Sequence, residues 1–459
     1  MARGKKKETL TPEDRLQAAL VPESEQPYKV PGNWCWVSLQ TIDQYRASST
    51  DPSKYPDTLF ELYSVPSSAD NYPEIVSGCE IGSTKQSVQK GDVLLCKINP
   101  RINRVWKVSQ YTGNALLASS EWIIIRNSKI VSDYLMYCFR APYFREYMLS
   151  NVSGVGGSLM RAQPKYVKTY PVPLPPLPEQ QRIVDRIESL FARLDEAKQK
   201  AQDALDSFET RKAAILHKAF TGELTAQWRK EHGMGMESWK IKKLSEVSTL
   251  QTGLMKGKKY SGKTVVLPYL RVANVQDGFL NLSEIKKIEV SEVLIDRYSL
   301  KNGDVLFTEG GDYDKLGRGT VWQGQIKNCL HQNHVFVVRP QADVLSPYFL
   351  SYQAGSRYGK QYFLKCSKQT TNLASINSIQ LKGFPVLMPT IEEQAQIVLL
   401  IDDLLAKEQQ AKEAAEGVLD QIDLIKKAIL ARAFRGELGT NDPSEESAVE
   451  LVRQVLQEN

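Results

Sequence analysis

The feature of this sequence that most constrains its fold is a unit that occurs twice at one fixed offset. Glu179–Val184 (EQQRIV) returns as Glu393–Val398 (EQAQIV), and Ala219–Leu224 (AFTGEL) returns as Ala433–Leu438 (AFRGEL), each 214 residues later. Because two matches about 40 residues apart share one offset, the segment between them has the same length in both copies. This period is far too long for a solenoid, so it indicates the duplication of a domain.

Three further pairs of landmarks lie upstream of these matches, and their spacing loosens with distance from them. They are Tyr170–Pro175 with Phe384–Pro389, Gly91–Leu95 with Gly303–Phe307, and Trp34 with Trp239. Each copy is therefore a variable block of about 140 residues followed by a fixed block of about 50 residues.

Each fixed block predicts a long helix, because its apolar residues alternate at steps of four and three. Arg211 alone interrupts this seam in the first block and Glu408 alone in the second. Apolar positions held for about five heptads are typical of a coiled coil. The predicted seams are Ile183, Ile187, Leu190, Leu194, Ala197, Ala201, Ala204, Phe208 and Ile215, and then Ile397, Ile401, Leu404, Ala411, Ala415, Val418, Ile422, Ile425 and Ile429.

The ends of the fixed blocks carry helix signals. Thr390 and Glu393 predict a capping box at the start of the second helix. Gly222 and Gly436 lie just past the last turn of each helix, where a left-handed residue ends it. A single helix of this kind could form a homodimer zipper. Two matched helices in one chain more simply pair with each other, since the linkage gives a high effective concentration. A pseudo-two-fold relation would make them antiparallel.

The variable blocks predict a mixed α+β domain of moderate size. Short apolar and β-branched runs punctuated by Gly and Pro predict strands. Aromatic residues and Leu at helical spacing predict helices near 133–149 and 347–363. The expected strands are 93–97, 122–126, 269–272 and 335–339.

Charge is distributed unevenly along the chain. Residues 28–175 carry 16 Lys or Arg and 11 Asp or Glu, and residues 240–383 carry 21 and 11. The fixed blocks are neutral or acidic. Two separate basic blocks in matching positions favour binding of a polyanion such as DNA, although ordinary surface charge is the alternative for either block alone.

Several loops in the variable blocks are both basic and rich in amides. Arg and Lys can reach guanine edges or phosphates, and Asn can bracket adenine. Solvated loops without a ligand are the alternative. The candidate DNA-binding residues are Lys97, Asn99, Arg101, Asn103, Arg104 and Lys107 in the first block, and Lys256, Lys258, Lys259, Tyr260, Asn274, Tyr313, Lys315, Arg318, Lys368 and Asn372 in the second.

The repeat, the Pro-rich approach to each helix, the Glu-Gln-Gln-Arg-Ile-Val start and the Ala-Phe-Thr-Gly-Glu-Leu-Thr-Ala-Gln-Trp-Arg end together resemble the specificity subunits (HsdS) of type I restriction–modification systems. The resemblance covers nearly the whole chain from about Tyr28. It implies a non-catalytic, cytoplasmic subunit with two target-recognition domains, each reading one half of a split double-stranded DNA site. It also implies that the strands at Gly91 and Gly303 lead into recognition loops, and that 156–159 and 370–373 form others.

As partners, the resemblance implies two methyltransferase subunits docked on the helices, which methylate adenine using S-adenosylmethionine. It further implies restriction (translocase–nuclease) subunits that need ATP and Mg. This chain itself is expected to bind none of these cofactors and no metal. No catalytic residue is expected in it.

The predicted fold class is α+β, with two mixed α/β target-recognition domains separated by two long antiparallel coiled-coil helices in a pseudo-two-fold arrangement. The predicted divisions are an N-terminal extension (1–27), recognition domain 1 (28–175), spacer helix 1 (176–224), recognition domain 2 (225–383), spacer helix 2 (384–438) and a tail with a short helix (439–459). A short helix is also expected between residues 10 and 20, within the extension.

Other chemistries find weak support. Gly257–Thr264 matches a P-loop pattern, but the residues after it predict a strand broken by Pro268 rather than the required helix. Cys329–His334 lacks a second pair at metal-ligand spacing. Asp277, Glu284 and Lys286 suggest surface charge more than a nuclease site. A purely structural coiled-coil adaptor without selective DNA binding remains the alternative function.

The remaining composition fits an intracellular globular protein. The six cysteines have irregular spacing and no CxxC pair, which favours buried reduced thiols over a disulfide framework. There is no run of 18 apolar residues, so no membrane span is expected. The basic start lacks an apolar stretch behind it, so no secretory signal is expected.

Overall fold

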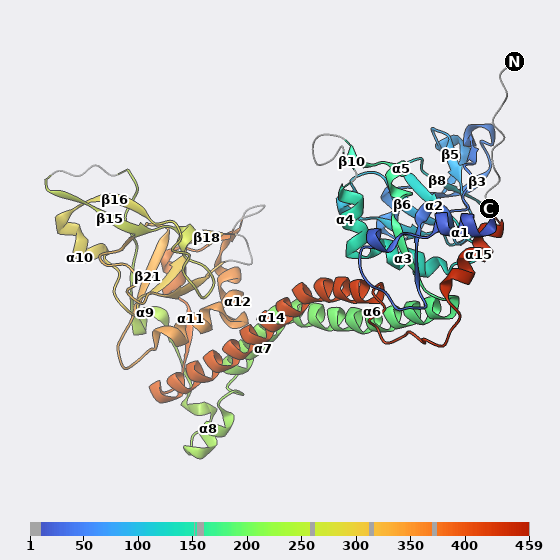
Figure 1. Cartoon of the computed structure of the whole chain (residues 1–459). Coiled ribbons are helices and arrows are strands. Elements are labelled where there is room, and N and C mark those ends of the chain that lie inside the picture. Colours follow the sequence, from blue (N-terminus) through green and yellow to red (C-terminus); the bar gives the residue numbers. More distant parts are fainter. Residues whose placement is uncertain are drawn as a thin grey trace. The chain divides into compact units, whose positions relative to one another are not determined.

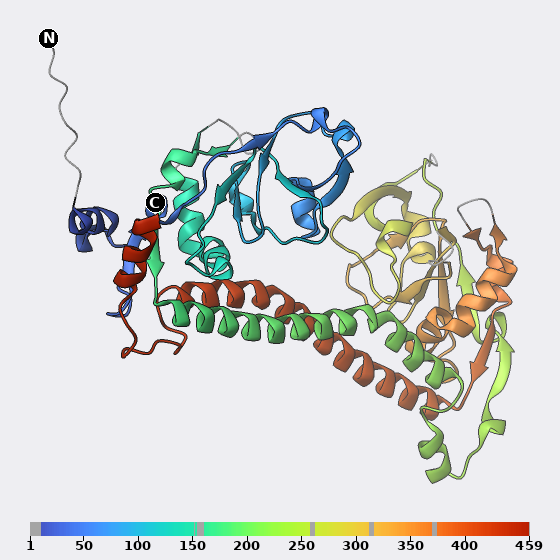
Figure 2. The same cartoon turned by 90° about the vertical axis from the view of Figure 1, so that its right-hand side faces the viewer.

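The computed structural model describes residues 11–150, 152–153, 160–257, 262–311, 316–369 and 374–458. The chain divides into two compact units (Figures 1 and 2). Unit 1 is Met1–Lys200 with Gly417–Asn459, and unit 2 is Ala201–Glu416. Each unit therefore combines one variable block with parts of both fixed blocks, and unit 1 is assembled from two stretches far apart in the sequence.

The variable block of unit 1 folds around two small sheets. A five-stranded sheet has the order β2-β5-β8-β3-β4, and a three-stranded antiparallel sheet has the order β7-β6-β9. All residues of β6 and β9 are buried, as expected for apolar strands covered on both faces. The strands are β2 (Ser49–Thr50), β3 (Leu59–Tyr63), β4 (Glu74–Ser77), β5 (Lys85–Ser87), β6 (Val93–Cys96), β7 (Val105–Lys107), β8 (Ala115–Ala118) and β9 (Trp122–Ile125).

Two short helices, α3 (Ser132–Arg140) and α4 (Pro142–Ser150), cover the smaller sheet of unit 1. The helical segment expected near 133–149 is thus confirmed, with a break at Ala141. Tyr134 of α3 is fully buried, and its ring meets that of Phe434 at 5.3 Å between centroids. The core of unit 1 therefore includes side chains from the end of the second fixed block.

Unit 2 repeats this plan with other residues. An antiparallel sheet has the order β14-β21-β17-β19, and a second sheet has the order β16-β15-β20. Two helices, α11 (Pro347–Gly355) and α12 (Arg357–Cys366), occupy the place of α3 and α4. The strands are β14 (Ser248–Gln251), β15 (Thr264–Leu270), β16 (Lys286–Ser291), β17 (Val305–Thr308), β19 (Gly319–Val321), β20 (Leu330–His331) and β21 (Val335–Pro340).

A strand pair in each unit joins the start of the variable block to its end. In unit 1, β1 (Cys35–Ser38) pairs antiparallel with β12 (Pro171–Leu174). In unit 2, β13 (Lys240–Lys243) pairs antiparallel with β24 (Pro385–Met388). The second strand of each pair leads directly into a long helix, so the pair fixes each variable block to its helix. The α+β class and the duplication predicted from the sequence are confirmed.

The fixed blocks form α6 (Leu177–Asp206), α7 (Phe208–Phe220) and α14 (Ile391–Ala433), which we call the spacer helices. The first block is thus broken where one continuous helix was expected. The hydroxyl of Ser207 donates to the carbonyl of Asp203 at 2.7 Å, a back-bond that bends helices. In the second block a single helix runs for 43 residues.

Within each unit the spacer helices pair antiparallel. In unit 1, Lys426 Nζ lies 2.5 Å from Asp195 Oδ1. In unit 2, Arg211 Nε lies 2.6 Å from Glu408 Oε2. In unit 1, Arg182 contacts Thr440, and the later Asp195 contacts the earlier Lys426. In unit 2, Phe208 lies beside Lys412, and the later Arg211 contacts the earlier Glu408. The order is reversed in both units, which confirms the antiparallel pairing expected from the repeat.

The first predicted seam is buried or half-buried throughout, but the second is wrong at three positions. Ala411, Val418 and Ile425 are exposed. A straight helix drifts by about 20° per heptad relative to a 3.5-residue repeat. Over this length the buried face therefore drifts: Ile425 is exposed, whereas Lys426 and Ile429 are half-buried and Leu430 is buried.

The helix ends follow the sequence signals in part. Gly222 and Gly436 have φ of +81° and +74°, so both end their helices in the left-handed region as predicted. The Oγ1 of Thr390 accepts the backbone N–H of Glu393 at 3.3 Å, which is one half of the predicted capping box. The other half is wrong, because the carboxylate of Glu393 is engaged by side chains from elsewhere in unit 2.

The two ends of the described chain meet in unit 1. The helix expected between residues 10 and 20 is α1 (Pro12–Ala19), with Thr11 and Asp14 forming a capping box. It packs against α15 (Ala448–Glu458), as Figures 1 and 2 show. Leu16 of α1 and Val452 of α15 are both buried in the core of unit 1. The extension and the tail therefore stabilise the same unit.

Candidate nucleic-acid interface

The Gly-Asp-Val motif of each variable block anchors the strand that precedes a candidate loop. Asp92, before β6, is buried and accepts two hydrogen bonds from the guanidinium of Arg126 at 2.7 and 2.6 Å. Asp304, before β17, does the same with Arg339 at 2.7 and 2.8 Å. These matched ion pairs hold the starts of β6 and β17, the strands that lead into the two loops, in equivalent positions.

The loop of unit 1 turns at two asparagines. Asn99 and Asn103 adopt left-handed backbone with φ of 48° and 50°, which Asn tolerates better than most residues. The side-chain amide of Asn103 donates to the carbonyl of Phe139 at 3.0 Å. The Oδ1 of Asn99 is buried and has no hydrogen-bond partner among the described residues. These two candidates therefore shape the loop in addition to any contact that they make with a ligand.

The two lysines at the ends of this loop differ in their surroundings. Lys107 forms an ion pair with Asp133 at 2.6 Å, which compensates its charge. The backbone N–H of Lys97 donates to the carbonyl of Glu121 at 2.9 Å, and its own carbonyl accepts from Ala162 at 2.9 Å. Lys97 is half-buried at the point where β6 ends.

Three candidates of unit 1, Arg101, Asn103 and Arg104, line one cavity of about 470 Å³. We call it the basic cavity. Its lining is completed by Ser68, Ile102, Val105, Arg140, Arg145 and Lys427. The last three cations were missed from the sequence. Arg140 and Arg145 belong to helices with apolar faces, and Lys427 belongs to a fixed block, so no loop composition signal pointed to them.

The candidates of unit 2 are dispersed among different surroundings. Lys256 and Lys368 are exposed. Arg318 Nη1 donates to Gln276 Oε1 at 3.1 Å. Asn274 is 3% exposed, and its amide bonds the backbone of Arg271, Asn281 and Glu284, so it holds a turn together. Outside the described residues lie Lys258, Lys259, Tyr260, Tyr313, Lys315 and Asn372, as well as the segments 156–159 and 370–373.

A second cavity, of about 460 Å³, lies in unit 2 at the end of β17. Glu309 and His334 are joined by a hydrogen bond on its wall, and Asn333, Asn377 and Tyr298 also line it. The backbone N–H of Glu309 donates to the carbonyl of His334 at 3.0 Å, which repeats the contact between Lys97 and Glu121. At structurally equivalent positions the two units thus carry side chains of opposite charge.

The landmarks at the start of each spacer helix are buried anchors. Trp34 donates its indole N–H to Glu179 Oε2 at 2.8 Å in unit 1. Trp239 donates to Glu393 Oε2 at 3.0 Å in unit 2. Burial raises the pKa of Glu179, against the opposing effect of the hydrogen bond from Trp34. The same tryptophan–glutamate contact thus ties each variable block to its helix.

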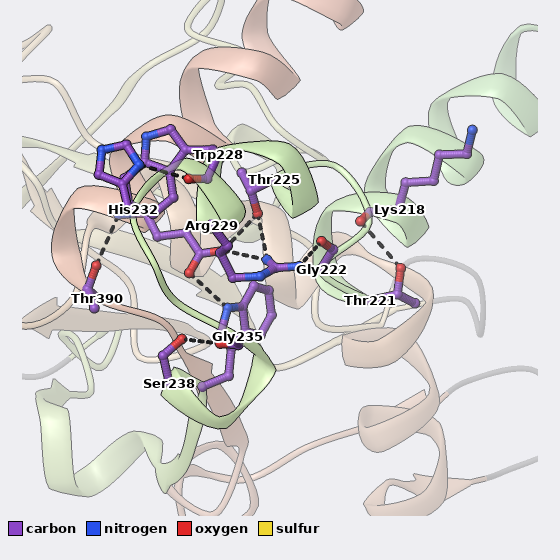
Figure 3. A network of polar contacts seen from close by, with 12 residues as sticks. Lys218, Thr221, Gly222, Thr225, Trp228, Arg229, His232, Gly235, Ser238 and Thr390 are labelled. Carbon is purple, nitrogen blue, oxygen red and sulfur yellow. Dashed lines mark hydrogen bonds and ion pairs between the residues drawn. The ribbon is translucent and has the colours of Figure 1, made fainter.

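The anchor in unit 2 contains an additional buried cation. Arg229 Nη1 lies 2.6 Å from Glu393 Oε1 and 3.0 Å from the hydroxyl of Thr225. Arg229 Nη2 donates to the carbonyl of Gly222 (Figure 3). The guanidinium therefore bridges the end of α7 and the start of α14. The equal spacing of the landmarks in the two copies therefore reflects a packed framework.

A matched pair of glutamines completes each framework. Gln180 accepts the backbone N–H of Val131 at 3.0 Å, and Gln394 accepts that of Ser346 at 2.8 Å. Both side chains are buried and also donate to a proline carbonyl one turn earlier, at 3.0 and 3.1 Å. Each glutamine thus joins the start of a spacer helix to the start of α3 or α11.

The strand expected after the P-loop pattern is present as β15, and no helix follows Thr264. The expected break at Pro268 is wrong, because β15 continues through it. Pairing with β20 starts only at Tyr269, so Pro268 needs to pair with β16 alone. Because β15 begins at Thr264, the described part of this pattern offers no helix N-terminus that could hold phosphate.

The other alternative chemistries also resolve into structural contacts. His331 is buried with Nδ1 2.8 Å from the carbonyl of Val335, and burial lowers its pKa to about 4. Asp277 pairs with Lys360, and Glu284 pairs with Arg271 and Lys286. Among the described residues, no group of three or more His, Cys, Asp or Glu is arranged to hold a metal ion.

All six cysteines are free thiols. Cys35, Cys96, Cys138 and Cys329 are buried as expected, whereas Cys366 is half-buried and Cys79 is exposed. Across the described ranges, every helix is too short or too polar to cross a membrane.

Known proteins resemble this chain in both sequence and fold. It is 27% identical over 318 residues to the type I restriction enzyme EcoKI specificity subunit of Escherichia coli K12, covering 69% of this chain and 68% of that one. It is 26% identical over 319 residues to the StySPI specificity subunit of Salmonella potsdam, covering 68% and 67%.

The fold matches the crystal structure of the HsdS subunit from Thermoanaerobacter tengcongensis with a TM-score of 0.66 and 22% identity. The match covers 90% of this chain and all of that one. A structure described in work on complex assembly and conformational transition of the type I R-M system matches with a TM-score of 0.64 and 23% identity.

The family model described as the type I restriction modification DNA specificity domain matches twice, over residues 61–205 and 236–416. The two matches fall on the two copies of the repeat and together cover most of the chain. This chain therefore belongs to the family of type I restriction–modification DNA specificity subunits.

Proposed function

We propose that this chain is the DNA-recognition subunit of a type I restriction–modification complex, in which each variable block reads one half of a bipartite target. The proposal depends on one observation: the two units share the same structural framework but carry different residues in the loops that follow β6 and β17. Both units keep the tryptophan–glutamate anchor and the buried Asp–Arg pair. In contrast, the positions that follow β6 and β17 carry Lys97 and Glu309.

This difference supports two distinct half-sites. A lysine at the end of β6 suits guanine edges and phosphates, whereas a carboxylate at the end of β17 accepts from the amino group of cytosine. The chain is non-catalytic in this scheme. Its contribution is to select the DNA, through base contacts that specify and phosphate contacts that position.

Chemistry would be supplied by the other subunits of the complex. Two methyltransferase subunits with S-adenosylmethionine would dock on the spacer helices, and restriction subunits would require ATP and Mg. The spacer helices would set the distance between the half-sites. Exposed apolar side chains on α14, among them Leu399 and Leu424, support a partner on this helix.

Mapping of methylated adenine across the host genome, with and without this gene, tests the function. We expect one bipartite sequence to lose methylation in the deletion strain. Exchange of the variable block of unit 2 for that of another family member should change one half of this sequence and leave the other intact. A structural adaptor would leave the methylated sequence unchanged after the exchange.

A further inference from the structure

The basic cavity of unit 1 brings together five cations, and its described lining residues include no carboxylate. Its lining includes Arg101 and Arg104 from the loop after β6, Arg140 of α3, Arg145 of α4 and Lys427 of α14. We propose that this cavity binds a phosphate group of the DNA backbone, whatever the base sequence. The proposal deepens the proposed function and rests on it.

Two of the guanidinium groups are held in place by neutral acceptors. Arg145 donates through Nε and Nη2 to the carbonyl of Arg101 at 3.1 and 2.7 Å. Arg140 Nη2 donates to the carbonyl of Val105 at 2.9 Å. A carbonyl oxygen orients a guanidinium without neutralising it, so both charges remain available to an anion.

None of the five cations takes part in an ion pair with another described residue. The neighbouring lysine Lys426 is paired with Asp195, and Lys107 at the end of the loop is paired with Asp133. Burial lowers the pKa of Arg140, because a low dielectric penalises the charged form. A bound anion would offset this penalty through its attraction to the guanidinium and would reduce the mutual repulsion of the five charges.

Unit 2 shows that the duplicated framework does not require these cations. The matched contacts of Val131 and Ser346 with their glutamines align α3 with α11. Under this alignment Arg140 corresponds to Gly355, and Arg145 to Lys360, whose charge is paired with Asp277. Under the offset of the repeat, Lys427 corresponds to Ala213. The contacts that both units share, such as the tryptophan–glutamate anchor and the Asp–Arg pair, are those that the fold needs. The cations of the basic cavity are found in unit 1 and are not repeated at the corresponding positions of unit 2.

The chemistry of the set favours phosphate over a base edge. Guanidinium forks match phosphate oxygens in geometry and are always charged. Five like charges around one space suit an anion, while bases present neutral donors and acceptors. Lys427 lies on the spacer helix α14, so a phosphate held here would contact both the variable block of unit 1 and a spacer helix.

The test compares Arg101→Gln and Lys427→Gln with the unaltered full chain. Both side chains are exposed, and neither donates a hydrogen bond to another described residue. Binding to a fluorescein-labelled duplex of arbitrary sequence is measured by anisotropy over a range of salt concentrations. We expect each variant to bind about five- to tenfold more weakly, with the slope of log K against log salt reduced by about 1.

The matched control is Lys200→Gln, which removes a charge already paired with Glu196 at 2.6 Å on the same helical rod of unit 1. It should change binding by less than about twofold. Far-ultraviolet circular dichroism and the melting temperature of each variant check that folding is intact.

Unchanged affinity and salt slope in both variants would overturn the proposal. So would a loss confined to the chain's own target sequence, since that indicates base reading. Inorganic phosphate that stabilises the unaltered chain and not Arg101→Gln, with no change in duplex binding, would assign the cavity to a free anion and also overturn it. The proposed function fails separately, if the unaltered chain in its complex does not distinguish its target from other duplexes.

Discussion

Arg211 and Glu408 interrupt the two apolar seams, and they form an ion pair with each other, with Nε 2.6 Å from Oε2. The pair joins α7 to α14 in unit 2. Under the offset of 214 the corresponding positions are Ile425 and Leu194, which are apolar. The polar pair therefore occurs in one half of the repeat, where it can fix the register of the two helices.

Replacing one member of this pair should destabilise unit 2 more than replacing both. Glu408→Leu leaves a half-buried guanidinium unpaired and should lower the free energy of unfolding by about 1–2 kcal/mol. The double variant Arg211→Leu/Glu408→Leu should regain most of this loss through apolar packing. Urea unfolding of the two single variants and the double variant gives the coupling energy. Additive single effects would show that the pair is not coupled.

The two helix-start glutamates should respond differently to loss of charge. Glu393→Gln leaves the buried Arg229 without its partner and should cost about 3 kcal/mol, or about 6–12 °C in Tm. Glu179→Gln is the matched control. It keeps an acceptor for Trp34 and strands no buried cation, so it should cost less than about 1 kcal/mol. Thermal unfolding followed by circular dichroism measures both, and equal shifts would contradict the assigned role of Arg229.

Acid should weaken unit 2 through His331. Its pKa is about 4 in the folded chain and near 6.5 when unfolded, so only the unfolded chain takes up this proton between those values. The stability is fully present above pH 6.5 and is lost as the pH falls toward 4, by up to about 1.4 kcal/mol per pH unit. In His331→Gln the urea midpoint should depend less on pH in this window. His217→Gln, at an exposed site on α7, is the control and should retain the full dependence.

The two helix-ending glycines should differ in their tolerance of a side chain. Both have positive φ, so Ala costs about 1–2 kcal/mol of backbone strain at either site. A Cβ at Gly436 would lie 2.4 Å from Cγ of Pro31, a rigid ring, whereas a Cβ at Gly222 would meet Sδ of Met236 at 2.5 Å. Because the Met236 side chain is flexible and exposed, Gly222→Ala should lose less stability than Gly436→Ala. Melting temperatures of the two variants check this order.

Insertion of one heptad into each fixed block should lengthen the spacer of the DNA target. Seven helical residues add about 10 Å, which corresponds to roughly three base pairs. The insertions belong after Lys200 and after Glu416, where the two units divide. Methylation mapping reads the new spacer length. A target with its original spacing would count against a measuring role for the helices.

The repeat made the architecture predictable, because equal spacing of the landmarks required two similar units with paired helices. The structural roles of the landmark residues could not be predicted in the same way. Glu179 is explained by a tryptophan 145 residues earlier, and Glu393 by one 154 residues earlier. Such distant contacts leave no local pattern. The Gly-Asp-Val motif was linked to recognition loops. Its aspartates are instead buried ion-pair partners of Arg126 and Arg339, and they fix the strands that precede those loops.

The candidate site was predictable where a loop carried its own signal and not where tertiary packing assembled it. Arg101, Asn103 and Arg104 were found from loop composition, and they do share a cavity. Lys427 was not, because a lysine on a coiled-coil helix has the pattern of an ordinary solvated position. The seam of α14 failed at Ile425 for a related reason: a seven-residue period does not reveal how far a straight helix rotates along its length.

The composition of unit 1 from both ends of the chain has a consequence for biosynthesis. Residues 201–416 form a contiguous unit and can fold as soon as they leave the ribosome, whereas the core of unit 1 lacks Phe434 and Val452 until residues 417–458 have been made. The half of the protein that is synthesised first is thus the half that is completed last, and during this interval its open core is available to chaperones.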